Sequence, residues 1–212
     1  MYRPLISKTV LALLIVGMSS FAIVQTATAQ FKATIQLGMT GSSFRGGNLQ
    51  NTSIITRFGG GAAVRYEYAN GFELESGLFY VVKGSGLEGT YGSIPIEGTS
   101  EITYVELPVL FGYRFKRDSH YSPRIYAGPA MAFKTDAQIS FNAKGSDIVQ
   151  QEEDLTVEDK DLGIMVGVDV NTQFGSETLS FGIRSTFGYS NAREATPEIY
   201  NTSVALLVGI VF

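Results

Sequence analysis

The stretch that most constrains the fold runs from Ile102 to Phe115. From Val105 onward every second residue is large and apolar, and the alternate row carries Glu106 and Arg114. Side chains alternate between two faces in a strand, so this pattern predicts a β-strand with one apolar and one polar face. A soluble sandwich would place the apolar face on a second sheet, whereas a membrane barrel would place it on lipid.

Seven other segments alternate in the same way. With the first they cover residues 31–40, 58–68, 72–83, 102–115, 124–134, 161–174, 179–189 and 203–212. Each is close to the ~9–11 residues with which a tilted strand crosses a bilayer. Pro108 and the Gly128-Pro129 pair are expected to mark local bulges.

The connections between these segments alternate in length. Those after Tyr68, Phe115 and Phe174 are short, and the others are long and polar, including residues 84–101 and 135–160. The expected fold is therefore all-β, an eight-stranded antiparallel up-and-down transmembrane β-barrel with periplasmic turns and extracellular loops. Aromatic residues gather at the expected strand ends, as interfacial girdles require, and the chain ends on Phe212.

The N-terminus has the pattern of a secretory signal peptide. Arg3 and Lys8 flank the start of an apolar stretch that ends before the small residues Ala27 and Ala29. A membrane anchor is the alternative, but the stretch is short, contains glycine and serine, and lacks a charged stop. We expect residues 1–29 to be removed by cleavage after Ala29, and residues 30–212 to form the outer-membrane barrel domain.

Composition removes several classes of function. The formal charge is −4, so nothing favours nucleic-acid binding, which needs a basic face. The chain has no cysteine, and therefore neither disulfides nor thiolate metal sites. Twenty-four glycines, 14 phenylalanines and 11 tyrosines fit an all-β chain.

The inward row of the expected barrel carries many charges. An eight-stranded barrel is just wide enough to be filled by side chains, so we expect these charges to pair inside it as a structural network. The expected network consists of Arg65, Glu67, Glu73, Glu75, Lys83, Glu106, Arg114, Asp169 and Arg184. Two functional alternatives stay open: a path for protons or ions, or Glu73 and Glu75 acting as acid and base.

Other groups carry weaker signals. His120 lies in a short turn, where an exposed residue is expected, and sequence neighbours do not make a catalytic triad. The glycines of residues 59–61 lack the lysine and the helix of a phosphate loop. The acidic run from Glu152 to Asp161 lacks the spacing of a calcium loop and is expected to be a solvated loop. No catalytic, cofactor or metal site is predicted.

The order of three motifs resembles the PorT-like outer-membrane β-barrel family of the Bacteroidota. The motifs are residues 71–80 with Lys83-Gly84, residues 104–110, and residues 126–129. The resemblance covers nearly the whole mature chain. It implies a barrel in the outer membrane and no catalytic residues. The family's namesake takes part in protein secretion and gliding, a role that a domain resemblance does not transfer.

The expected function is that of a small outer-membrane barrel that is not an enzyme, with a structural or interaction role through its extracellular loops. The expected partners are outer-membrane lipid, the barrel-insertion machinery and an envelope protein bound by the loops. An accessory part of a secretion machine is one alternative. A barrel enzyme and a soluble lipocalin-like ligand carrier, whose apolar row would point inward, are the others.

Overall fold

The computed structural model describes residues 31–46, 52–91, 94–116, 119–143, 149–154, 158–191 and 198–212. The predicted signal peptide therefore lies outside the described residues. The strands are β1 (Phe31–Arg45), β2 (Thr52–Ser53), β3 (Ile55–Glu67), β4 (Phe72–Tyr91), β5 (Ile94–Arg114), β6 (Tyr121–Ala143), β7 (Val149–Asp154), β8 (Lys160–Phe174), β9 (Glu177–Gly188) and β10 (Tyr200–Val211). No helix in the described ranges is long and apolar enough to cross a membrane.

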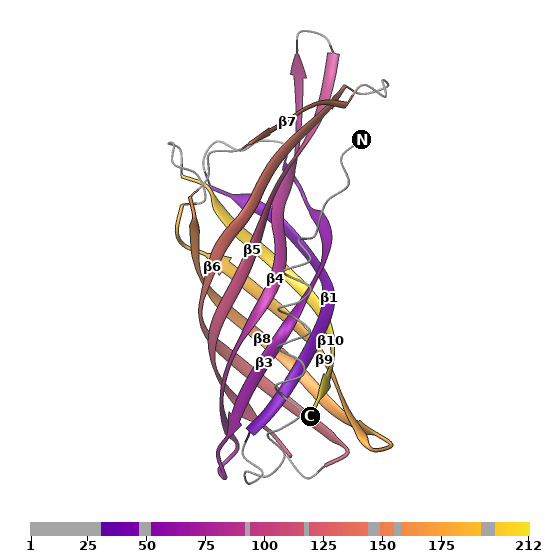
Figure 1. The fold of residues 1–212 in the computed structure, drawn as a ribbon, viewed down its shortest axis with the longest axis vertical. Coiled ribbons are helices and arrows are strands. Elements are labelled where there is room, and N and C mark those ends of the chain that lie inside the picture. Colours follow the sequence, from indigo (N-terminus) through magenta and orange to yellow (C-terminus); the bar gives the residue numbers. More distant parts are fainter. Residues whose placement is uncertain are drawn as a thin grey trace. The chain divides into compact units, whose positions relative to one another are not determined.

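Eight of these strands close into a barrel (Figure 1). The order is β3-β1-β10-β9-β8-β6-β5-β4, and β4 pairs back onto β3, with every neighbour antiparallel. The N-terminal and C-terminal strands meet at one seam, where Thr34 lies opposite Val211. The predicted fold, an eight-stranded antiparallel up-and-down barrel, is confirmed. The two short strands are additions, because β2 pairs with β4 and β7 pairs with β6.

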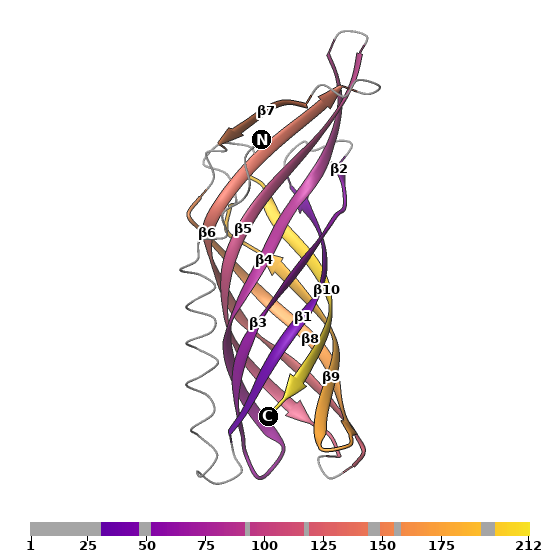
Figure 2. The same ribbon diagram turned by 45° about the vertical axis from the view of Figure 1, so that its right-hand side comes forward.

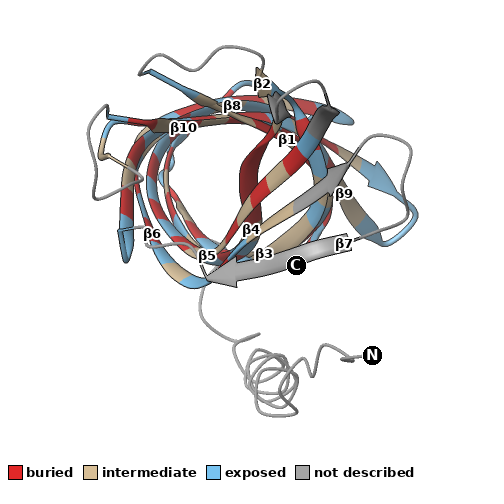
Figure 3. Cartoon of the chain, turned by 90° about the horizontal axis from the view of Figure 1, so that it is seen from above, coloured by how far each residue is buried: buried red, intermediate tan, exposed pale blue. Residues whose placement is uncertain are grey.

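The alternating rows face as the pattern predicts. On β10 the apolar residues Val204, Leu206, Val208 and Ile210 are exposed, whereas Ser203 and Ala205 are buried. Seen along the barrel, buried and exposed residues alternate in bands along the strands that enclose the lumen (Figure 3). A soluble carrier would have the opposite arrangement, with its apolar row inside. The outer wall is therefore suited to lipid.

Tight turns connect neighbouring strands at one end of the barrel, which we call the short-turn end. Gly71 adopts a φ of 90°, a value that a residue without Cβ accepts at little cost, and its N–H donates to the Tyr68 carbonyl at 3.1 Å. Gly175, with a φ of 63°, has the same role between β8 and β9. Both hairpins agree with the turns read from the sequence.

The opposite end, which we call the long-loop end, differs from the expectation. Residues 84–91 and 94–101, expected to belong to a loop, are instead paired strands, because β4 and β5 stay paired up to Tyr91 opposite Ile94. The hairpin rises past the ends of β9 and β10, and β6 extends with it to Ala143 (Figures 1 and 2). This part of the hairpin has no continuous apolar row, so the pattern that marks a membrane strand is missing from it.

Proline interrupts the wall without a bulge. Between β4 and β5 the register passes directly from Ser76 opposite Val109 to Phe79 opposite Glu106, and it is unshifted across the gap. Pro108 has no N–H to donate, and the Ser76 hydroxyl donates to its carbonyl oxygen at 2.8 Å. The β5–β6 register is likewise unshifted across Gly128-Pro129. The prediction of bulges at these prolines is wrong. Instead, residue pairs are missing between β4 and β5 beside Pro108 and between β5 and β6 beside Pro129.

Candidate functional site in the charged lumen

Toward the short-turn end, three arginines and three carboxylates form one buried cluster. Its members are Arg65 on β3, Glu73 and Glu75 on β4, Arg114 on β5, Arg124 on β6 and Asp169 on β8. We call these six residues the lower cluster. Their charges balance one for one, which is the condition under which buried charges are tolerated.

Arg124 lies at the centre of the lower cluster. Its Nε is 2.6 Å from Glu73 Oε2, and its Nη1 is 2.9 Å from Glu75 Oε2 and 3.0 Å from Asp169 Oδ2. One guanidinium thus contacts all three carboxylates. Arg124 reaches across β5 at Gly112, where a Cβ atom would lie 2.8 Å from the Arg124 Nε. The glycine provides the space through which the arginine on β6 reaches strand β4.

The two other arginines complete the lower cluster. Arg65 Nη2 is 2.8 Å from Glu75 Oε2, and these two residues are also register partners on β3 and β4. Arg114 Nε is 2.6 Å from Glu73 Oε1, and its Nη1 donates to the Ser122 carbonyl at 2.9 Å. The side chains of Glu73 and Glu75 are 1 % exposed. Both carboxylates are bound by guanidiniums and are not accessible to a substrate. This arrangement does not favour the alternative in which Glu73 and Glu75 act as acid and base.

A second cluster lies toward the long-loop end, and we call it the upper cluster. Lys83 Nζ is 2.8 Å from Glu106 Oε1 and 3.4 Å from Asp161 Oδ2. Asn201 donates from Nδ2 to Asp161 at 3.0 Å and to the Tyr104 hydroxyl at 3.3 Å. These residues come from β4, β5, β8 and β10, so the cluster ties together opposite sides of the wall.

Arg184 lies apart from both clusters. The ion pairs of the described residues do not include it. Its Nη2 donates to Gln36 Oε1 at 2.9 Å, its Nε donates to the Tyr126 hydroxyl at 3.4 Å, and its Cζ lies 4.5 Å from the centre of the Phe79 ring. Aromatic faces and neutral acceptors hold this cation where a carboxylate would be expected.

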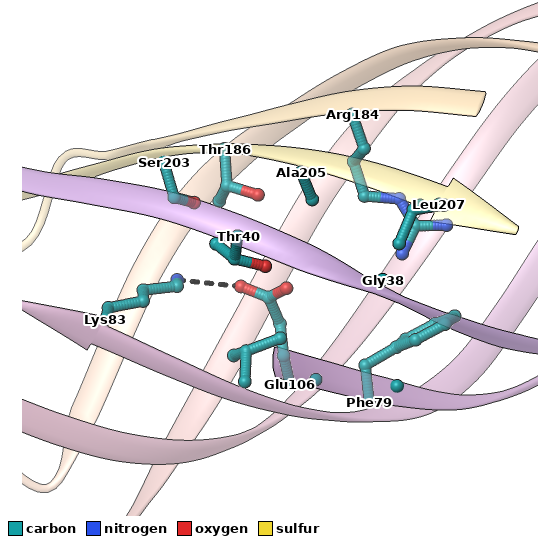
Figure 4. A pocket seen from close by; sticks show the side chains of 13 residues that line it. Gly38, Thr40, Phe79, Lys83, Glu106, Arg184, Thr186, Ser203, Ala205 and Leu207 are labelled. Atoms are coloured by element: carbon teal, nitrogen blue, oxygen red, sulfur yellow. Dashed lines mark hydrogen bonds and ion pairs between the residues drawn. The ribbon is translucent and has the colours of Figure 1, made fainter. Parts of the chain in front are cut away.

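A small cavity lies between Arg184 and the upper cluster. Its volume is about 30 Å³, which is room for one or two water-sized particles. Figure 4 shows Lys83 and Glu106 on one side of it and Arg184 and Phe79 farther along the lumen. Ligands of the size that lipocalin-like barrels hold do not fit this cavity. Buried side chains fill the lumen around it.

All nine charged residues expected in the lumen are buried. Seven of them belong to the lower or the upper cluster, and the eighth is Arg184. The ninth, Glu67, is buried opposite Glu73 in the β3–β4 register. The sequence reasoning missed Arg124 and Asp161. Arg124 precedes the outward-facing Ile125 on β6, so the alternation of the strand already places Arg124 in the inward row. Asp161 was expected in a solvated acidic loop, but it begins the inward row of β8 and is 2 % exposed.

The other residues considered as candidates from the sequence are the histidine, the three glycines and the acidic run, and their contacts in the structure indicate no functional site. His120 is exposed on the turn before β6, and its Nε2 lies 3.4 Å from the Thr172 hydroxyl. Gly59 and Gly61 belong to β3, where added Cβ atoms would lie 2.6 Å and 2.1 Å from carbonyl oxygens of β4. Of the acidic run, Glu158 and Asp159 are exposed, and Asp159 pairs with Lys134 at 3.0 Å. The described residues contain no group of three or more His, Asp or Glu side chains placed so that it could hold a metal ion.

Comparison with known proteins agrees with this architecture. Among solved structures, the outer membrane protein OprG from Pseudomonas aeruginosa superposes with a TM-score of 0.51 at 10% identity, covering 89% of this chain and 99% of OprG. Ail of Yersinia pestis gives 0.44 at 13% identity, with 87% and 100% covered. Neisserial surface protein A gives 0.45 at 16% identity, with 86% and 96% covered. No curated protein matches the chain.

The family described as outer membrane protein beta-barrel domain matches residues 24–192, which is most of the chain. This match agrees with the closed barrel, the apolar outer wall and the charged lumen. The chain belongs to the outer membrane protein beta-barrel domain family, and its place is the outer membrane.

Proposed function

We propose that this protein is a plugged outer-membrane barrel that is not an enzyme, and that it acts structurally or through contacts made at its long-loop end. One observation carries the proposal: at the long-loop end, β4 and β5 continue as a paired hairpin to Tyr91 and Ile94, past the ends of β9 and β10 (Figures 1 and 2). The hairpin provides a surface outside the lipid for an envelope protein partner. Lipid and the barrel-insertion machinery are the other proposed partners.

The proposed orientation places the long-loop end outside the cell and the short-turn end in the periplasm. The absence of cysteine from the chain allows a clean test. Glu88→Cys on the hairpin should react with a membrane-impermeant maleimide in intact cells. The matched variant Ser176→Cys, in the β8–β9 turn, should react only after the outer membrane is disrupted. The reverse labelling pattern would overturn the orientation.

The interaction role has its own experiment. We expect a variant in which residues 87–98 are replaced by Asn-Gly to insert and to keep heat-modifiable migration, because the removed pairs lie beyond the barrel. Cross-linking in cells would then compare its partners with those of the wild type. An unchanged set of cross-linked proteins would contradict a partner bound at the hairpin and would leave the structural role.

The lumen network is proposed to be a structural plug. Its support is the pairing within the two clusters and the small volume of the cavity beside Arg184. The purified barrel should therefore give no stepwise conductance in planar bilayers. Regular single-channel steps would instead favour an ion path.

Two finer assignments complete the proposal. The chain is proposed to be PorT-like and to come from the Bacteroidota, and the three motifs that support this lie on consecutive strands β4, β5 and β6. Residues 1–29 are proposed to be a signal peptide. N-terminal sequencing of the barrel from outer membranes should begin at Gln30, and a sequence beginning at Met1 would refute cleavage.

A further inference from the structure

We propose that the cavity beside Arg184 is a binding site for one small monovalent anion of halide size. The cavity is lined by side chains of β1, β4, β5, β9 and β10 (Figure 4). Of the charged residues that line it, Lys83 and Arg184 are cationic and Glu106 is anionic. Asp161 lies outside the lining but also pairs with Lys83, at 3.4 Å, so two cations meet two carboxylates here and the case for an anion rests on unused hydrogen-bond donors. This inference is independent of the role of the hairpin.

The hydrogen-bond inventory of the two cations leaves donors unused. An ammonium has three N–H donors, and Glu106 and Asp161 accept two of those of Lys83. A guanidinium has five N–H donors, and Gln36 and Tyr126 accept two of those of Arg184. Both side chains are more than nine-tenths buried, so unused donors require an acceptor close by.

Three hydroxyls add to this excess of donors. Thr40, Thr186 and Ser203 line the cavity, and each is 6 % exposed. Their hydroxyls have no hydrogen-bond partner among the residues that the structure describes. In Figure 4 all three lie on the side of the cavity that faces Lys83 and Glu106. Hydroxyls beside two cations in a confined space are suited to a small anion.

Size selects the class of anion. A volume of about 30 Å³ holds one or two water-sized particles, so a halide fits whereas sulfate or phosphate, each with five heavy atoms, does not. Gly38 and Gly59 line the cavity where neighbouring strands pack closely, since added Cβ atoms would lie 2.1 Å and 2.6 Å from the carbonyl oxygens of Leu206 and Tyr80. The volume of the cavity therefore selects the ligand by size.

The first test uses the full barrel in an uncharged detergent. Melting is followed by heat-modifiable migration in sodium chloride, sodium bromide or sodium gluconate at equal ionic strength. A site that binds only the folded state should raise the melting temperature saturably, by roughly 3–6 °C at ten times Kd, in chloride and bromide but not in gluconate. Equal melting in all three salts would overturn the proposal.

Variants locate the effect. Thr186→Val and Thr40→Val remove hydroxyls at nearly constant volume and should weaken halide binding at least threefold. Thr34→Val is the matched control, because Thr34 is buried in the lumen but does not line the cavity. An equal loss in Thr34→Val would refute the location. Crystals of the wild type grown in bromide should show an anomalous peak between Lys83 and Arg184, and density without anomalous signal would mean water only.

Discussion

Gly112 on β5 and Arg124 on β6 are in such close contact that a Cβ atom at Gly112 would lie 2.8 Å from the arginine Nε. The guanidinium passes over the glycine to reach Glu73 and Glu75 on β4. The pairing of the lower cluster thus depends on a residue that carries no charge. The same contact provides a test of the cluster with a very small change.

We expect Gly112→Ala to displace Arg124 and to destabilise the barrel by about 1–3 kcal/mol, as overpacking does in well-packed interiors. Urea unfolding of the barrel in lipid vesicles measures the change. Gly41→Ala is the control, because its Cβ would lie 3.4 Å from the Ile54 Cγ2, an ordinary contact. Equal stabilities of the two variants would show that Gly112 has no special role.

Removal of the central cation should be costly. Arg124→Gln leaves three carboxylates with two arginines, and breaking a buried pair costs about 3–5 kcal/mol. The double variant Arg124→Gln with Asp169→Asn should recover part of the loss, because charge balance is restored. A double-mutant cycle on unfolding free energies measures the coupling. Strict additivity of the two single variants would contradict a direct interaction between these residues.

The facing of β5 can be tested on its lipid side. Val109 is 36 % exposed on the outer wall, so Val109→Arg should cost roughly 2–4 kcal/mol near the bilayer middle and impair assembly. Thr99→Arg is the matched control on the extended part of the same strand and should cost less than about 1 kcal/mol. If Val109→Arg assembles as well as the wild type, the facing of the strand is wrong.

The Ser76 hydroxyl donates to the Pro108 carbonyl beside the gap between β4 and β5. Ser76→Ala should leave this carbonyl without that donor and cost about 1–3 kcal/mol. Hydrogen exchange should also become faster at the backbone around the gap. Ser185→Ala serves as control, because the Ser185 hydroxyl makes no hydrogen bond to the described residues. Unchanged exchange and stability in Ser76→Ala would disprove the compensation.

Much of this molecule can be predicted from its sequence, because lipid imposes a strict alternation on one face of each strand. Residues 105–114 of β5 and 203–211 of β10 face as predicted, and Glu106 and Arg114 are buried as predicted. The paired extension of β4 and β5 could not be predicted, because lipid imposes no pattern outside the membrane. Asp161 was misplaced for a related reason: it stands at the border between an acidic run and a membrane strand.

The ion-pair partners within the lumen could not be predicted from the sequence, for a different reason. Which arginine meets which carboxylate depends on the register between strands that are distant in the chain. Arg124 contacts carboxylates from β4 and from β8, 45 or more residues away. Alternation fixes the face on which a charge lies, but the stagger of the strands fixes its partners.

The distribution of the clusters over the strands has a consequence for assembly. The lower cluster uses only β3, β4, β5, β6 and β8, which are adjacent in the sheet, so it can be complete while the sheet is still open. The bonds from Arg184 to Gln36 and from Asn201 to Asp161 need β9, β10 and β1. The arginines and carboxylates can thus fix the stagger of five of the eight strands first, and the remaining polar contacts form as the first and last strands join.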